Sequence, residues 1–169
     1  MMRTERLIRM AGLEVMILDH PLEGGIEAVM AMLRQRDLSF DQYEELFIFE
    51  SETQLNSAIQ WLEAQDIETI RCELMLLPSD RVTAGELFED YIIHSKQNHV
   101  YLDLAISAIF SLEEKQPGAE PVQAAWQLEE HLIGTIKLDH EQMYLIDRQL
   151  VELADRIAHA YGCQTSWQA

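Results

Sequence analysis

The stretch DLSFDQYEELFIFESETQLNSAIQWLEAQDIE (residues 37–68) decides the fold. Its run from Glu45 to Glu50 consists of β-forming residues bounded by acids and therefore predicts a strand. Ser51 stands three residues before Gln54, as in a capping box, so a helix is expected to begin there. Residues at helical spacing would form the buried stripe of that helix: Leu55, Ala58, Ile59 and Leu62.

A second apolar run, Thr69 to Leu77, predicts another strand, which ends at Pro78. Residues 45–77 are thus expected to form a strand–helix–strand unit. The crossover has the length that joins two parallel strands. We expect at least one of the consecutive residues Phe47 and Ile48 to face the core from the first of these strands.

Helices are expected on both sides of this unit. Two N-terminal helices are predicted within residues 1–36, and a helical segment within residues 79–132, over about 83–92, 100–112 and 122–130. Residues 133–169 predict a strand over 133–138, a long helix over 142–160 and a closing tail, CQTSW. The sequence has no internal repeat. Residues 1–169 are interpreted as a single α+β domain, helix-rich overall, with residues 37–78 as its strand–helix–strand unit.

The charge of the chain is strongly acidic. Thirty Asp and Glu residues face twelve Lys and Arg, giving a formal net charge of -18. Such a surface repels nucleic acid and anionic lipid and attracts basic partners, so direct nucleic-acid or membrane binding is not expected. The acids could equally serve solubility alone. No apolar run approaches the roughly 20 residues that span a bilayer, and the protein is expected to be cytoplasmic.

The sequence offers no clear chemistry. Cys72 and Cys163 fit no metal spacing and are expected to be free thiols. Glu86, Asp90 and His94 would share one helix face, but that face points away from the apolar stripe, so no metal is predicted. No catalytic residues and no cofactor are predicted, because the chain has no nucleophile motif and no glycine-rich phosphate loop. This favours a protein without enzymatic activity and leaves an enzyme open.

Two stretches resemble the regulator of ribonuclease activity B family, the protein inhibitors of ribonuclease E. Residues 37–68 are similar to the family's opening turn, short aromatic strand and helix, and LIDRQLVELADRIAHAYGCQTSW to its last helix and closing strand with a final tryptophan, here Trp167. The family's glycine after the first helix is replaced by Gln65-Asp66, and of its Tyr-Asp-Gly-Trp ending only the tryptophan is present. The resemblance implies a ferredoxin-like α/β sandwich, here with a helical insertion, and an acidic inhibitor of a ribonuclease.

These observations together predict a non-enzymatic regulatory or inhibitor protein. It would bind a basic protein, which the resemblance implies is an RNA-handling enzyme such as a ribonuclease. An enzyme or metal-binding helical protein, whose site forms only in three dimensions, is one alternative. A nucleic-acid-mimicking immunity or phage inhibitor is another. The oligomeric state is not predicted. The residues expected to bind the partner are acids near the strand and two tryptophans: Glu44, Glu45, Glu50, Glu52, Trp61 and Trp167.

Overall fold

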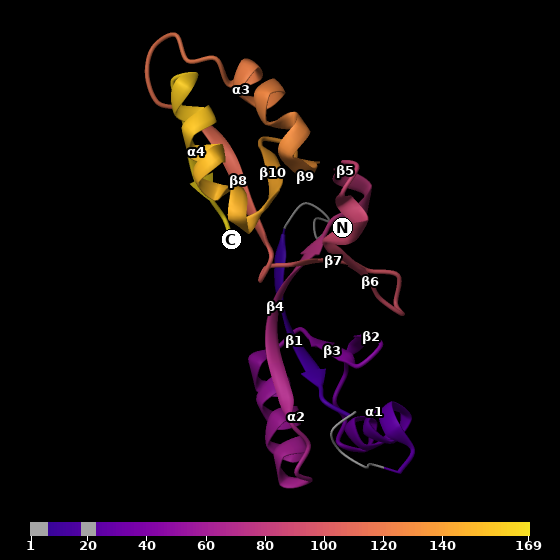
Figure 1. Ribbon diagram of the computed structural model, residues 1–169. Coiled ribbons are helices and arrows are strands. Elements are labelled where there is room, and N and C mark those ends of the chain that lie inside the picture. Colours follow the sequence, from indigo (N-terminus) through magenta and orange to yellow (C-terminus); the bar gives the residue numbers. More distant parts are fainter. Residues whose placement is uncertain (1–6, 18–22) are drawn as a thin grey trace. The chain divides into compact units, whose positions relative to one another are not determined.

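The computed structural model describes residues 7–17 and 23–169. The chain forms two compact units (Figure 1). Unit 2 consists of residues 8–76 and 93–101, and unit 1 of Leu7 and residues 77–92 and 102–169. Each unit is described by itself below. That residues 1–169 act as one domain stays a prediction.

Unit 2 is built from alternating strands and helices. Its elements are β1 (Ile8–Val15), α1 (Gly25–Gln35), β2 (Asp41–Tyr43), β3 (Leu46–Phe49), α2 (Glu52–Ala64) and β4 (Thr69–Leu77). The strands form a sheet in the order β2-β3-β1-β4, which is extended by β7 (Val100–Asp103) and β6 (Ile92–His94). Strand β1 is antiparallel to both β3 and β4, so these two strands run parallel to each other. The predicted crossover is confirmed, with β1 inserted between the strands that it joins.

Helix α2 begins and ends as its sequence dictates. The hydroxyl of Ser51 accepts a hydrogen bond from the backbone N–H of Gln54 at 3.1 Å, which confirms the predicted cap. At the other end Asp66 has a φ of 58°, in the left-handed region that glycine normally occupies. The next residue, Ile67, is 2% exposed and donates its N–H to Leu62 O at 2.9 Å. An aspartate therefore ends this helix where the resembling family has a glycine.

Both faces of the unit 2 sheet are buried around β3. Phe47 belongs to the cluster that lies against the helices, and Ile48 to a second cluster with Tyr101. Phe47 is fully buried and Ile48 is 1% exposed, so the prediction that at least one of the two faces the core is confirmed, and both are buried. The close packing also explains a glycine in the middle of β1. A Cβ on Gly12 would lie 2.5 Å from Sγ of Cys72, which no real contact allows.

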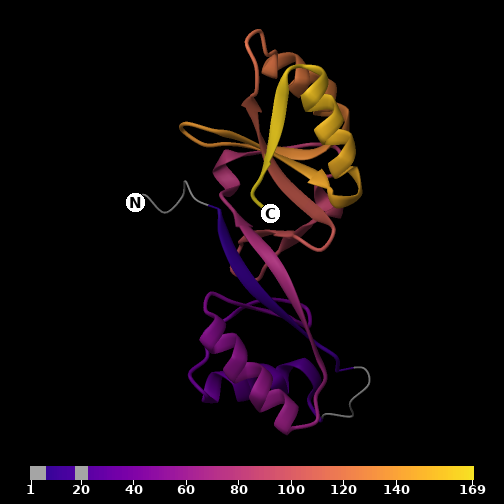
Figure 2. The same ribbon diagram turned by 90° about the vertical axis from the view of Figure 1, so that its left-hand side faces the viewer.

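Unit 1 contains a second antiparallel sheet. Its elements are β5 (Val82–Ala84), β8 (Ser107–Glu114), α3 (Pro121–Leu128), β9 (Leu132–Lys137), β10 (Gln142–Asp147), α4 (Val151–Ala160) and β11 (Cys163–Trp167), with short 3-10 turns at Ser79–Arg81, Phe88–Asp90, Glu129–His131 and Arg148–Leu150. The strand order is β11-β8-β10-β9-β5. Both helices contribute to one hydrophobic cluster on the sheet, α3 through Leu128 and α4 through Ala154 and Ile157 (Figure 2).

The two units use the same topology. Each contains a β-α-β-β-α-β segment, from β1 to β4 in unit 2 and from β8 to β11 in unit 1. In each sheet the fourth strand of the segment lies next to the first, then come the third and the second: β4-β1-β3-β2 and β11-β8-β10-β9. In each segment, the two strands that a helix connects are not neighbours in the sheet, because another strand of the segment lies between them.

The expected fold, a helix-rich ferredoxin-like sandwich with a helical insertion, is wrong. The part of the chain that the structure describes is sheet-rich, with 37% of its residues in strands and 34% in helices, and it forms two sheets. Residues 79–132 were expected to be helical, but they hold β5, β6, β7 and β8, and only α3 among the expected helices. The physical reason is that β8 is buried on both faces, so that its continuous apolar run also fits a helical stripe.

The terminal segments need similar corrections. Residues 8–15 of the expected first helix form β1, whereas α1 agrees with the second expected helix; residues 1–6 and 18–22 lie outside the described residues. The expected long helix over 142–160 is strand β10 followed by α4. Glu86, Asp90 and His94 share no helix face, because residues 83–92 hold a strand end and a 3-10 turn. Strands β4, β9 and β11 are confirmed.

We expect Phe47→Ala to lower the free energy of unfolding by roughly 3–5 kcal/mol, the usual cost of emptying a buried aromatic site. Equilibrium urea denaturation measures the change. Exposed Tyr43 on the neighbouring strand provides the control, since Tyr43→Ala removes a large ring from the surface. Equal losses in the two variants would contradict the core position of Phe47.

Asp66→Gly is expected to raise the free energy of unfolding by roughly 0.5–1 kcal/mol. Glycine adopts the left-handed conformation without the steric cost that a Cβ imposes, and part of this gain is offset by its larger unfolded-state entropy. The matched change Asp66→Val should be destabilising, because a β-branched residue is least tolerant of positive φ. The same denaturation measurement applies, and an Asp66→Gly variant weaker than Asp66→Val would overturn the assignment of this cap.

Candidate functional site

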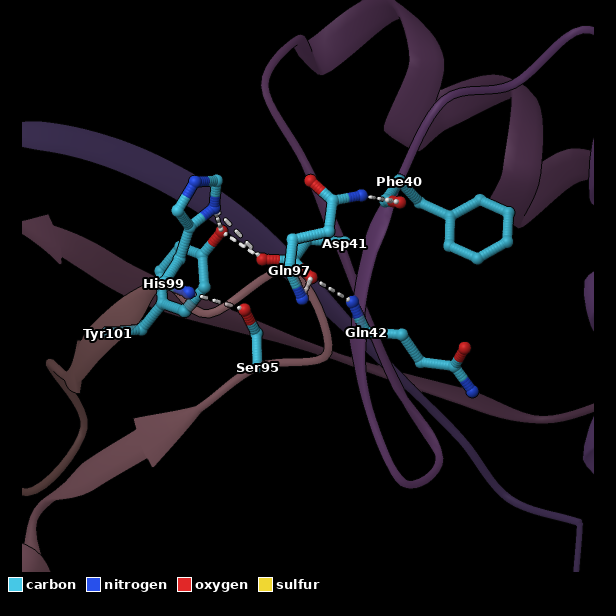
Figure 3. A network of polar contacts seen from close by, with 7 residues as sticks. All are labelled: Phe40, Asp41, Gln42, Ser95, Gln97, His99 and Tyr101. Carbon is cyan, nitrogen blue, oxygen red and sulfur yellow. Dashed lines mark hydrogen bonds and ion pairs between the residues drawn. The ribbon is translucent and has the colours of Figure 1, made fainter.

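A buried carboxylate organises a polar network in unit 2. Asp41, the first residue of β2, is 6% exposed. Its Oδ2 accepts hydrogen bonds from the Tyr101 hydroxyl at 2.7 Å and lies 3.1 Å from Nδ1 of His99. Its Oδ1 accepts from the backbone N–H groups of Gln42 at 2.8 Å and Gln97 at 3.2 Å. Figure 3 shows the side chains of His99 and Tyr101 both pointing toward this carboxylate.

The turn between β6 and β7 places the donors of this network. Ser95 donates its backbone N–H to His99 O at 3.0 Å, and its hydroxyl accepts the N–H of His99 at 3.1 Å. Asn98 occupies the left-handed region with a φ of 62°, which suits an asparagine in a tight turn. Lys96 donates its N–H to Gln42 O at 2.9 Å, so backbone bonds also tie the turn to β2.

The network determines the charge states of its members. Burial raises the pKa of Asp41, but hydrogen bonds from Ser95, Tyr101 and two backbone amides outweigh it and hold that pKa below its usual range. Burial, together with the hydrogen bond to Asp41, raises the pKa of Tyr101 far above its ordinary value. Asp41 is therefore an anion and Tyr101 a neutral donor at pH 7. Nδ1 of His99 lies within hydrogen-bond distance of both the Asp41 carboxylate and the Tyr101 hydroxyl.

Asp41, Gln97, His99 and Tyr101 of this network line a cleft of about 570 Å³. The volume lies within the range of small-ligand sites. Apolar side chains of β1, β3 and β4 form part of the wall, and polar and charged groups the rest. The lining residues outside the network that carry polar groups are Arg34, Ser39, Glu50, Ser51 and Gln54.

The arrangement suits binding and proton exchange better than nucleophilic catalysis. Asp41 orients the His99 ring through Nδ1, and the His99 side chain is 46% exposed. Asp41 itself is already saturated with donors and is not available to a metal. In the described part of the chain no group of three or more His, Cys, Asp or Glu residues could hold a metal ion. Cys72 and Cys163 form no disulfide, and burial raises the pKa of Cys163, which makes its thiol less reactive.

The four predicted acids lie in two pairs, one at each end of β3 in unit 2. Glu44 and Glu45 form the turn between β2 and β3, and Glu50 and Glu52 stand at the junction of β3 and α2. All four are exposed. Glu52 forms an ion pair with Arg71, so its charge is partly neutralised. Glu50 also lines the cleft.

The two predicted tryptophans lie in different units. Trp61 on α2 is half-buried against the unit 2 core, with the guanidinium of Arg36 5.2 Å from the centre of its ring. Trp167 on β11 packs on Phe110, with ring centres 4.8 Å apart, and donates Nε1–H to Asp155 at 3.3 Å. Their role in partner binding stays a prediction.

Sequence reasoning missed the residues of the network. The expected helix over 100–112 includes Tyr101, and neither Asp41 nor His99 lies in a predicted functional motif. Asp41 lies 58 residues from His99 and 60 from Tyr101 in the sequence, so no local motif joins them. A weak signal was the polar run HSKQNH between apolar segments, which is a turn pattern.

Comparisons of the chain with family models, curated proteins and solved structures return no match. They do not test the resemblance to the ribonuclease E inhibitors. No helix within residues 7–17 and 23–169 is long and apolar enough to cross a membrane.

Asp41→Asn is expected to lower the free energy of unfolding by about 1–3 kcal/mol at pH 7, because donors aimed at a buried anion lose their partner. The folded pKa of Asp41 lies below the unfolded value of about 3.9, so its contribution is complete above that pH and is lost as the pH falls through the folded pKa. The difference between wild type and variant should therefore shrink below pH 4. Urea denaturation at pH 7, 5, 4 and 3 measures it, with exposed Glu44→Gln as control. A difference that stays constant to pH 3 would show that Asp41 is not the stabilised anion.

Proposed function

We propose that this protein is a cytoplasmic, non-enzymatic regulatory protein that binds a basic protein partner and inhibits it. Its acidic surface attracts the partner electrostatically and covers the partner's basic surface. Following the resemblance to the ribonuclease E inhibitors, the partner would be an RNA-handling enzyme. Cys72 and Cys163 form no disulfide, which agrees with a reducing compartment.

The exposed acids of the β2–β3–α2 segment are the observation that carries this proposal. Glu44, Glu45 and Glu50 are exposed on a segment whose backbone is fixed by pairing and capping. Glu44 has a φ of 50°, and its carbonyl accepts a hydrogen bond from the Gln42 side chain at 2.9 Å, so the turn conformation is defined. Charges held in place in this way lose less entropy on binding than charges on a mobile tail. The net charge of -18 on the whole chain adds a negative long-range field to that of these acids.

Glu44→Lys combined with Glu45→Lys is expected to slow association with the partner by roughly tenfold or more at low salt, because reversing rim charges acts mainly on the association rate. The partner is first isolated by affinity capture from the native host. Association kinetics are then measured over a salt series. The effect should weaken as salt shortens the Debye length to about 8 Å at physiological ionic strength.

The matched control is Glu86→Lys combined with Glu141→Lys. It changes the net charge equally, at two exposed positions in unit 1. If both double variants associate equally fast, the acids of unit 2 have no specific role and the proposal fails. The partner's RNA is then added as a competitor. If this protein covers the RNA-binding surface, including by nucleic-acid mimicry, the RNA should displace it, whereas binding elsewhere on the partner should be unaffected.

The cleft supports a second candidate function, an enzyme or ligand-binding protein. The specific observation is the His99 ring, oriented by Asp41 and lining a cleft of about 570 Å³. Such a ring can accept or donate a proton at Nε2. A ligand screen followed by NMR, with wild type and His99→Ala, tests this function. Binding or turnover that is lost in His99→Ala, together with equal partner association by the charge-reversed variants, would favour it.

A further inference from the structure

Helix α3 in unit 1 carries an exposed tryptophan that its own core does not use. Trp126 is 69% exposed and Val122, one turn earlier, is 55% exposed. Both lie on the same helix face as Ala125 and Glu129, by their spacing of three and four residues. Large exposed apolar groups that lie together commonly mark an interaction surface.

These residues form one wall of a groove of about 430 Å³ in unit 1. The groove is lined by residues of α3, the turn that follows it, β9 and β10: Pro121, Val122, Ala125, Trp126, Glu129, Leu132, Thr135, Gln142 and Tyr144. Along α3 it covers residues 121 to 129, which corresponds to about 12 Å of helix at 1.5 Å per residue. Two turns are the length over which a docked helix presents side chains at i, i+3 or i+4, and i+7.

The charges around the helix wall are acidic. Glu120 and Glu129 stand at the two ends of α3 and are exposed, and Glu130 follows next. Residues 120–131 contain no Lys or Arg. On the sheet wall, Lys137 follows Thr135 on the same face of β9, so the acidic side of the groove is that of α3. The apolar side chains of Val122 and Trp126, with acids at both ends of α3, fit an apolar residue flanked by bases.

We infer that this groove binds a basic amphipathic helix of a protein partner, with an aliphatic side chain against Trp126 and Lys or Arg near Glu120 and Glu129. The inference rests on the proposed function in that the partner is basic, and it assigns the partner's apolar contact to unit 1. A second copy of this chain is a poor occupant, because two chains of charge -18 repel each other.

The test uses a synthetic 16-residue helical peptide with Leu on one face and Lys and Arg on the other. Titration of the isotope-labelled protein, followed by NMR, should shift backbone resonances of residues 120–131 and saturate. Trp126→Ala should weaken binding roughly tenfold or more, as truncation of a tryptophan anchor does. Because Trp126 and Val122 are exposed, Trp126→Ala and Val122→Ser should fold like wild type.

Two control peptides separate the apolar contact from general attraction to an acidic protein. One replaces Leu by Ser and keeps every charge, and the other replaces Lys and Arg by Glu and keeps every Leu. Both should bind at least tenfold more weakly than the parent peptide. Equal binding of the Ser peptide and the parent, or equal binding of the parent to wild type and Trp126→Ala, would overturn the inference. Shifts outside unit 1 alone would overturn it as well.

The remaining outcomes distinguish this inference from the proposed function. Peptide binding to the Glu44→Lys/Glu45→Lys protein should match wild type, since those acids belong to unit 2. If that variant associates with the partner normally while the groove still binds the peptide, the proposed role of the unit 2 acids is rejected and the inference about the groove is supported. If the groove does not bind the peptide while reversal of the unit 2 acids slows association, only the inference about the groove is rejected. Analytical ultracentrifugation that shows a wild-type dimer and a Trp126→Ala monomer would make a second copy the occupant and overturn the inference.

Discussion

Backbone pairing of β1 on both of its edges is the constraint on which unit 2 depends. β1 is in register with β4 from Ile8↔Leu76 to Val15↔Thr69, and with β3 on its other side. Gly12 permits this because a side chain there would collide with Cys72. Once β1 is inserted, the β2–β3 hairpin lies on one side of it and β4 on the other. The acidic turn at Glu44 and the buried Asp41 are therefore positioned by a strand whose own contribution to the cleft is the apolar side chain of Met10.

The sequence predicted elements that carry a local signal. β3, α2 and β4 were identified because alternating acids, a serine cap and a proline mark their ends. β1, β8 and β10 were read as helices because each is buried on most of its length, and a buried strand lacks the polar alternation that distinguishes it. The exposed acids of the candidate site could be predicted from their place beside β3. Asp41, His99 and Tyr101 could not, since only the pairing of distant strands brings them together.

The repeated β-α-β-β-α-β topology was equally hidden in the sequence. A topology requires apolar periodicity and chain-reversing residues, and these can be supplied by different amino acids. Asp66 ends α2 in unit 2 with a φ of 58°, and Gly162 ends α4 in unit 1 with a φ of 74°. Capping differs in the same way, since a serine hydroxyl caps α2, whereas α4 follows a 3-10 turn that begins beside Asp147. Because the two units form the same topology with different residues at corresponding positions, the amino-acid sequence shows no internal repeat.

The interleaved division of the chain has a consequence for the order of folding. The chain leaves unit 2 after residue 76, forms part of unit 1 over residues 77–92, and returns to unit 2 over residues 93–101. During synthesis β1 must wait for β4, more than fifty residues later, before its second edge is paired, and the Asp41 network must wait for Tyr101. Such long-range pairing slows folding, because loop closure is required before the contacts stabilise the chain. Unit 2 can nevertheless be complete before β8 leaves the ribosome, so the nascent chain can hold its acidic turn in place while unit 1 is still being made.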